Sequence, residues 1–163
     1  MSLQQAPNFS LNHITGRPVS LSDYRGHTVV VVFSGRDSTD QARQIGQTLR
    51  SRYDIYALPM ISVLDLHGIP RMMHGLAKGR VEAGYKELVA TATQALQAAG
   101  KPMPPDPSQV IVMLPDWDGS VTASFGLQGT DQQAVAVLID GNGLIRGYGA
   151  GANAGEQILA LFG

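Results

Sequence analysis

The residues best suited to chemistry are the polar side chains of one turn, residues 34–41. Ser38 or Thr39 would act as a nucleophile if a base lay beside it. No histidine is near these two residues in the sequence, so a base would have to come from a distant position. The histidines to consider are His13, His67 and His74. The alternative use is structural, and we favour it, because Ser and Thr commonly cap the first turn of a helix.

Arg36 suggests a second use of the same turn. A guanidinium beside the free N–H groups at the start of a helix can hold an anion. The alternative is a solvated arginine on a surface turn. The sequence leaves both interpretations open.

A second group of ligand-type side chains lies at positions 67–74. Thioethers and imidazoles together suit a soft metal such as Cu(I), and the segment contains His67, Met72, Met73 and His74. The two histidines are seven positions apart across a glycine and a proline, which does not match one helix face. Methionine more often fills a core, so we expect Met72 and Met73 to pack against the sheet. The sequence therefore predicts no metal and no cofactor.

Composition excludes several classes of protein. The chain has 163 residues with 12 basic and 13 acidic side chains, and neither sign forms a run. We expect no nucleic-acid partner and no anionic membrane surface. No apolar stretch approaches the roughly 20 residues of a membrane span. The first residues lack the basic and apolar regions of a signal peptide, so we expect a cytoplasmic protein.

The turn is positioned by a strand before it and a helix after it. Residues 28–33 contain four consecutive valines, which predicts a strand buried on both faces. Beyond the turn, an apolar stripe at steps of three and four residues predicts an amphipathic helix. Its members are Ala42, Ile45, Leu49 and Tyr53.

The remaining elements alternate between strands and helices. We expect a hairpin at 9–21, strands at 55–63 and 110–114, helices at 72–99 and up to 125, a hairpin at 134–148, and a last helix capped by Asn153 with Glu156. Residues 100–107 hold four prolines and form a connector. This alternation predicts a parallel sheet covered on both faces, with antiparallel pairing from the last hairpin.

These elements and their motifs resemble the thioredoxin-like redoxins, the superfamily of peroxiredoxins and thiol–disulfide oxidoreductases. The motifs, in order, are Ala6–Leu11, Val19–Gly26, Val29–Phe33, Leu114–Gly119, Ala123–Gly126 and Val137–Gly143. The resemblance implies an α/β, thioredoxin-like three-layer fold: a central mixed β-sheet with helices on both faces, an N-terminal hairpin and a long helical insertion at about 70–107. We expect a single domain over 1–163.

The chain departs from this superfamily where the family does its chemistry, because it has no cysteine. The Cys-x-x-Cys of thioredoxin-type members would fall on Ser38 and Gln41. In peroxiredoxins the Thr-x-x-Cys would place Thr39 at the threonine and Ala42 at the peroxidatic cysteine. The family's cis-proline falls on or near Ala134. A cis bond before a non-proline residue costs about 2.5–4 kcal/mol, so we expect no cis geometry there.

A hydroxyl does not replace the thiolate on which the family's chemistry depends. We therefore expect neither disulfide exchange nor peroxide reduction. One remaining function is a redox-inactive binding module, which would hold a peptide, protein or small ligand along the vacated turn. The other is an enzyme with repurposed hydrolytic or metal-assisted chemistry at the same turn. The candidate ligand-binding residues are Arg36, Ser38, Thr39, Gln41, Gln133 and Ala134.

The long helix predicted at 72–99 also suggests a homodimer. Its second half, residues 90–99, is uncharged and rich in alanine. Small side chains allow close packing on a second copy of the chain.

Overall fold

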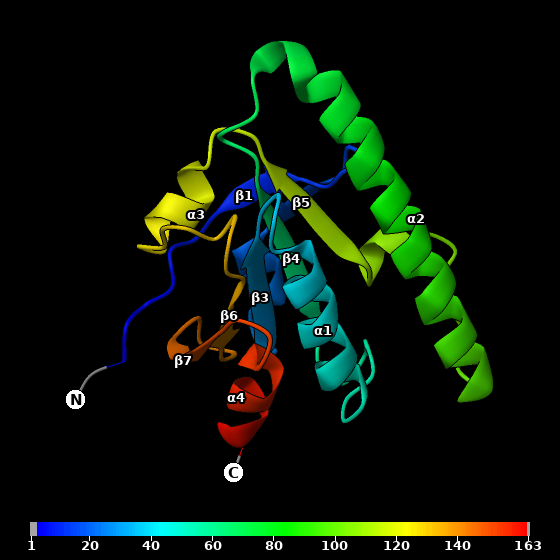
Figure 1. The fold of residues 1–163 in the computed structure, drawn as a ribbon. Helices are drawn as coiled ribbons and strands as arrows, with labels where there is room; N and C mark the ends of the chain where they lie inside the picture. The colour runs from blue at the N-terminus through cyan, green and yellow to red at the C-terminus, as the bar shows by residue number, and fades with distance from the viewer. Residues whose placement is uncertain (1–2, 163) are drawn as a thin grey trace.

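A five-stranded mixed sheet forms the centre of the computed structural model, which describes residues 3–162 (Figure 1). The strand order is β5-β4-β3-β6-β7. The first three are parallel, and β6 and β7 are antiparallel to their neighbours. Their bounds are β3 Val29–Ser34, β4 Met60–Asp65, β5 Val112–Asp116, β6 Val135–Ile139 and β7 Ile145–Ala150. The mixed sheet predicted from the sequence is confirmed.

Strand β3 is buried along its whole length, as its valine run predicts. Successive side chains of a strand point to opposite faces. Val31 and Phe33 therefore enter one core, and Val30 and Val32 enter the other. This central strand holds the start of the candidate turn, residues 34–41, in place.

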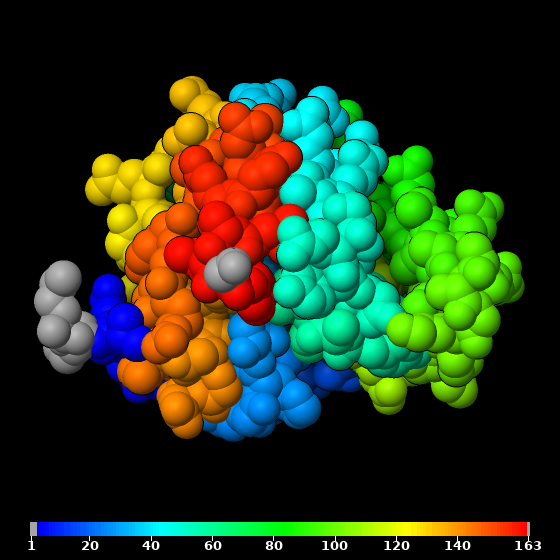
Figure 2. All heavy atoms as spheres, turned by 90° about the horizontal axis from the view of Figure 1, so that it is seen from below, coloured from blue at the N-terminus to red at the C-terminus, as the bar shows by residue number. Residues whose placement is uncertain are grey.

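Helices and the N-terminal hairpin cover the two faces. The Val30 and Val32 face packs on Ile45 of α1 and Ile158 of α4, and these two helices lie side by side (Figure 2). The Phe33 face packs on Phe125, with ring centroids 4.8 Å apart. The covering elements are α1 Thr39–Arg50, α4 Ala154–Ala160, β1 Ser10–Asn12, β2 Pro18–Ser20, the 3₁₀ helix η1 Leu21–Tyr24 and α3 Ser120–Ser124. The three-layer arrangement is confirmed.

The helical insertion lies between β4 and β5. It consists of η2 (Arg71–Met73), α2 (His74–Ala98), a connector without regular structure, and η3 (Pro107–Gln109). Helix α2 runs past β5 and extends beyond the rest of the fold (Figure 1). Its single buried side chain is Leu96.

Two predicted details are wrong. The strand predicted at 55–63 starts only at Met60, because Asp54 Oδ1 accepts hydrogen bonds from the N–H groups of Tyr56 and Ala57 and turns the chain. Asn153 precedes α4, but its side chain makes no capping hydrogen bond. The backbone makes that turn itself, because the Ala154 N–H donates to the Gly151 carbonyl.

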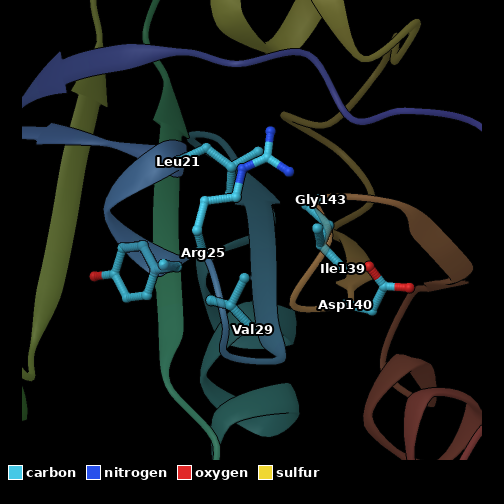
Figure 3. A pocket seen from close by; sticks show the side chains of 7 residues that line it. Leu21, Arg25, Val29, Ile139, Asp140 and Gly143 are labelled. Carbon is cyan, nitrogen blue, oxygen red and sulfur yellow. The ribbon is translucent and has the colours of Figure 1, made fainter.

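The turn between β6 and β7 is built around Asp140. Its Oδ1 accepts from the N–H groups of Asn142 (2.9 Å) and Leu144 (3.0 Å), and Arg25 donates to the Asn142 carbonyl. The hollow between Arg25 and Asp140 measures about 10 Å³ (Figure 3). That is room for about one water molecule, so this hollow is no ligand site.

Candidate functional site at the turn between β3 and α1

The predicted site lies where β3 leaves the sheet, at the carboxyl ends of the parallel strands. Gly35, Arg36, Asp37 and Ser38 connect β3 to α1, which begins at Thr39. In open α/β sheets ligands bind outside this edge. The position of the turn therefore fits a binding role, and its side chains decide what can bind.

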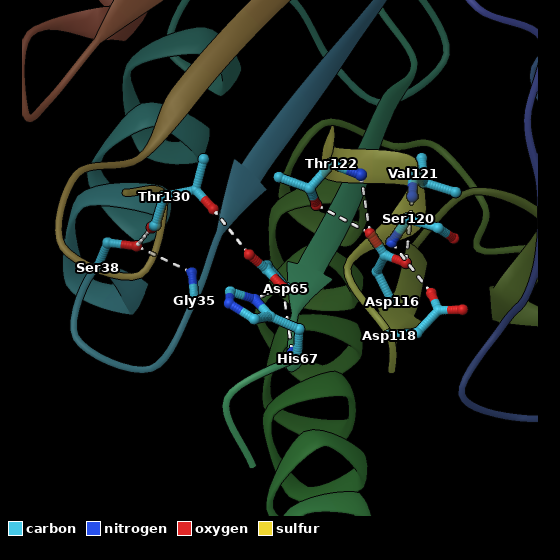
Figure 4. Close-up of polar contacts among 10 residues, drawn as sticks. All are labelled: Gly35, Ser38, Asp65, His67, Asp116, Asp118, Ser120, Val121, Thr122 and Thr130. Carbon is cyan, nitrogen blue, oxygen red and sulfur yellow. Dashed lines mark hydrogen bonds and ion pairs between the residues drawn. The ribbon is translucent and has the colours of Figure 1, made fainter. Parts of the chain in front are cut away.

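Ser38 is fully buried and fixes the turn from inside. Its hydroxyl accepts a hydrogen bond from the Gly35 N–H at 2.9 Å and donates to the Thr130 carbonyl (Figure 4). The residue occupies the position before α1, but its side chain makes no capping bond to the helix. The predicted capping role is therefore replaced by a link to the loop before β6.

That loop, residues 129–134, is packed against the turn backbone to backbone. The Asp37 N–H donates to the Asp131 carbonyl at 2.8 Å. A Cβ atom added at Gly35 would lie 2.6 Å from the Asp131 Cα, closer than real contacts allow. Only glycine permits this approach, so the turn is closed and its inner surface is filled.

Gln41 and Ala134 complete the closure. The Gln41 Oε1 accepts a hydrogen bond from the Ala134 N–H at 2.8 Å, and the Ala134 carbonyl accepts from the Gly151 N–H at 2.8 Å. Ala134 is fully buried, and no cis peptide bond occurs in residues 3–162. Both backbone groups of Ala134 are therefore occupied within the chain.

The outward side chains of the site remain accessible. Arg36, Thr39 and Gln133 are exposed, and Gln41 is half-buried. Asp37 and Asp40 are exposed on the same turn. The six predicted residues thus fall into two groups. Arg36, Thr39 and Gln133 form an exposed rim, and the buried or half-buried Ser38, Gln41 and Ala134 support it from inside.

The three histidines considered as partners for Ser38 or Thr39 make other contacts. His13 Nε2 lies 2.8 Å from the Ile111 carbonyl. His67 Nδ1 lies 2.7 Å from Asp65 Oδ1. His74 Nε2 lies 3.2 Å from the Ile69 carbonyl, and its ring stacks on Trp117 with centroids 4.5 Å apart. No hydrogen bond joins any of them to Ser38 or Thr39 in residues 3–162.

The pair of Asp65 and His67 is the feature that sequence reasoning missed. Asp65 Oδ1 accepts from both the backbone N–H and the ring of His67, and its Oδ2 lies 3.5 Å from Thr130 Oγ1 (Figure 4). The hydrogen bond to Asp65 and the charge of that carboxylate raise the pKa of His67. A usable signal was present, since Asp65 ends β4 beside Asp116, which ends β5.

Asp116 itself has a structural task. It is fully buried and accepts hydrogen bonds from the N–H and hydroxyl of Thr122 at 2.8 and 2.9 Å. These bonds anchor the first turn of α3 on the end of β5. Hydrogen bonds within the chain therefore occupy this carboxylate.

The four residues considered for a soft metal make other contacts or are exposed. His67 is bound to Asp65, and His74 is stacked on Trp117. Met72 is 90% exposed and Met73 43% exposed, so the prediction that both pack against the sheet is wrong. They precede α2 in the short helix η2, which lies outside the core. Among residues 3–162, no three His, Cys, Asp or Glu side chains are arranged to hold a metal.

Comparison with known proteins places this geometry in a family context. The model of the AhpC/TSA family matches residues 3–65, which is less than half of the chain. No curated protein sequence matches the chain at a significant level.

Solved structures match over nearly the whole chain. A candidate thiol:disulfide interchange protein DsbE from Chlorobium tepidum is 22% identical with a TM-score of 0.58, covering 100% of this chain and 99% of that one. An exposed lipoprotein thioredoxin from Streptococcus pneumoniae is 18% identical with a TM-score of 0.60, covering 96% and 98%. The thioredoxin domain of a thiol-disulfide oxidoreductase from Bacteroides vulgatus is 14% identical with a TM-score of 0.60, covering 99% and 98%.

The chain has a thioredoxin-like fold. At these identities the likeness carries the fold and not the activity. The chain has no cysteine, so the thiol chemistry in the names of its structural neighbours has no reactive group here.

The location of the protein stays a prediction. Among residues 3–162, no helix is both long and apolar enough to cross a membrane. The similar structures include an exposed lipoprotein and a secreted protein from Mycobacterium tuberculosis.

Proposed function

We propose that this protein is a redox-inactive binding module whose partner, a peptide or protein segment, docks on the exposed rim of Arg36, Thr39 and Gln133. The observation that carries the proposal is the closure of the turn beneath that rim. The Ser38 hydroxyl and both backbone groups of Ala134 are used within the chain. The rim side chains are therefore presented on a fixed backbone, which lowers the entropic cost of binding.

The closure also defines the mode of recognition. The N–H and the carbonyl of Ala134 are each already hydrogen-bonded within the chain. Recognition therefore relies mainly on side chains of the rim.

The charges around the rim favour a partner of mixed polarity. Arg36 is followed in the turn by the exposed carboxylates of Asp37 and Asp40, of which Asp40 pairs with Arg43 at 3.4 Å. The carboxylate of Asp37 opposes the binding of a free anion beside the guanidinium. A peptide or protein surface that carries both a carboxylate and hydrogen-bond donors can pair with the guanidinium and with the carboxylates of the turn. This supports a peptide partner over the anion site considered for Arg36.

Peptide selection tests the proposal. A phage-displayed library of random peptides is selected on the wild-type protein, and affinities of the selected peptides are measured by calorimetry. We expect Arg36→Ala and Thr39→Ala each to weaken binding five- to fiftyfold, the usual range for a central contact residue. Arg52→Ala is the matched control, because Arg52 is also exposed but follows the far end of α1.

Two results would overturn the proposal. One is a peptide that binds all three variants as tightly as the wild type, which would move the site elsewhere. The other is measurable insulin reduction or peroxide consumption by the purified protein, which would show that the protein is not redox-inactive.

A further inference from the structure

His13 is a buried ionisable side chain that is not part of the rim. It lies in the turn between β1 and β2 and is 2% exposed. Its Nε2 lies 2.8 Å from the Ile111 carbonyl, and its Nδ1 accepts the Thr15 N–H at 3.1 Å and lies 2.9 Å from the Thr15 hydroxyl. A carbonyl only accepts and an N–H only donates. The ring therefore fits its site with hydrogen on Nε2 and none on Nδ1, which is the neutral form.

The same ring supports the middle of helix α2. The ring of Tyr85 meets His13 edge to face, with centroids 5.0 Å apart and planes at 81°. Elsewhere α2 is anchored near its ends, by the stacking of His74 on Trp117 and by the buried Leu96. No side-chain hydrogen bond joins residues 75–98 to another element within the described part of the chain. The contact between His13 and Tyr85 is therefore the central attachment of a long exposed helix.

The charged groups around His13 come from its own hairpin turn and from the segment before η3. Arg17 of the hairpin donates to the carbonyl of Ser108 at 2.6 Å, and Asp106 accepts from the N–H and hydroxyl of the same serine. Burial, aided by the charge of Arg17, lowers the pKa of His13, while the Ile111 carbonyl and the Asp106 charge oppose the shift. The phenol of Tyr85 stays neutral in acid, because burial raises its pKa.

Protonation of Nδ1 would break this arrangement. The added hydrogen would occupy the lone pair that accepts the Thr15 N–H, so this N–H would lose its acceptor even where the Thr15 hydroxyl accepts the new hydrogen. The cation would also lie beside the charge of Arg17. Neither penalty applies once the imidazole is exposed to water. Exposure of the imidazole requires the hairpin turn and Tyr85 to separate.

We propose that His13 is a pH-sensitive latch, whose protonation in mild acid releases the middle of α2 from the hairpin. When released, the imidazole returns to an ordinary pKa of about 6.5. Proton linkage then raises the released fraction up to about tenfold per pH unit below that value, or up to about thirtyfold between pH 7.5 and pH 5.0. Release uncovers the half-buried inner side of the helix, which includes Val81 and Val89.

Hydrogen exchange of the full chain, corrected for intrinsic rates, tests the latch. Between pH 7.5 and pH 5.0, amides of residues 81–89 should lose protection by up to about thirtyfold, while those of β3 keep theirs. His13→Gln should abolish the change, because a glutamine amide offers a donor and an acceptor but does not titrate. His74→Gln is the matched control, because His74 also attaches α2 to another element, through Trp117. This variant should retain the change.

Three outcomes would overturn the latch. They are equal protection of α2 at the two pH values, a pH response that persists in His13→Gln, and loss of protection in β3 together with α2. If His13→Gln does not fold, NMR titration of the wild type decides. The midpoint of the His13 ring signal must then coincide with that of the α2 amides, and separate midpoints refute the proposal.

Discussion

The hydrogen bond between Gln41 and Ala134 gives the sharpest test of how the turn is held. We predict that Gln41→Met destabilises the protein by about 1–3 kcal/mol, the cost of leaving a buried N–H without an acceptor. Ala134 is fully buried, so water cannot replace the lost oxygen. For a chain of this length the loss corresponds to a fall in Tm of about 2–12 °C. Methionine keeps the length of the side chain, so the change tests the acceptor and not the volume.

Urea denaturation followed by circular dichroism measures the difference, with the m-value as a check that the compactness of the two end states is unchanged. Gln41→Glu is the matched control, because its carboxylate keeps the acceptor and a negative charge suits the first turn of a helix. We expect that variant to match the wild type at pH 7. The reasoning is refuted if Gln41→Met loses less than about 0.3 kcal/mol, or if both variants lose the same amount.

Three further predictions concern other parts of the molecule. Gly35→Ala should destabilise by roughly 1–3 kcal/mol, because its Cβ would overlap the Asp131 backbone. A Cβ at Gly79, in the second turn of α2, meets nothing within 4 Å, so Gly79→Ala should instead stabilise by up to about 1 kcal/mol. Urea denaturation compares the two variants. The raised pKa of His67 means that its bond to Asp65 stabilises the fold fully below pH 6.5 and loses that effect as the pH rises through the folded-state pKa. His67→Gln should therefore lower Tm at pH 5.5 and leave it unchanged at pH 9. The homodimer predicted from α2 should give twice the chain mass of 17.3 kDa in light scattering, and a constant mass of 17.3 kDa at every concentration would contradict it.

The sequence was most informative where a local pattern determines the structure. The valine run of β3 and the turn at Asp140 follow from strand burial and turn chemistry within a few residues. The exposure of Met72 was missed, because apolar character says nothing about whether a helix lies over a core. The bond from Gln41 to Ala134 spans 93 positions, and no periodicity links residues so far apart. The position of the turn between β3 and α1 could be predicted from the sequence, but the closure of that turn depends on such long-range contacts.

The pairing of Gln41 with Ala134 also restricts how this protein can change. A proline at position 134 has no N–H, so Ala134→Pro alone would leave the half-buried amide of Gln41 without its partner. A cysteine at position 41 would remove the oxygen that Ala134 needs. Either change alone therefore costs stability before any thiol chemistry is gained. Each residue of this pair makes replacement of the other costly.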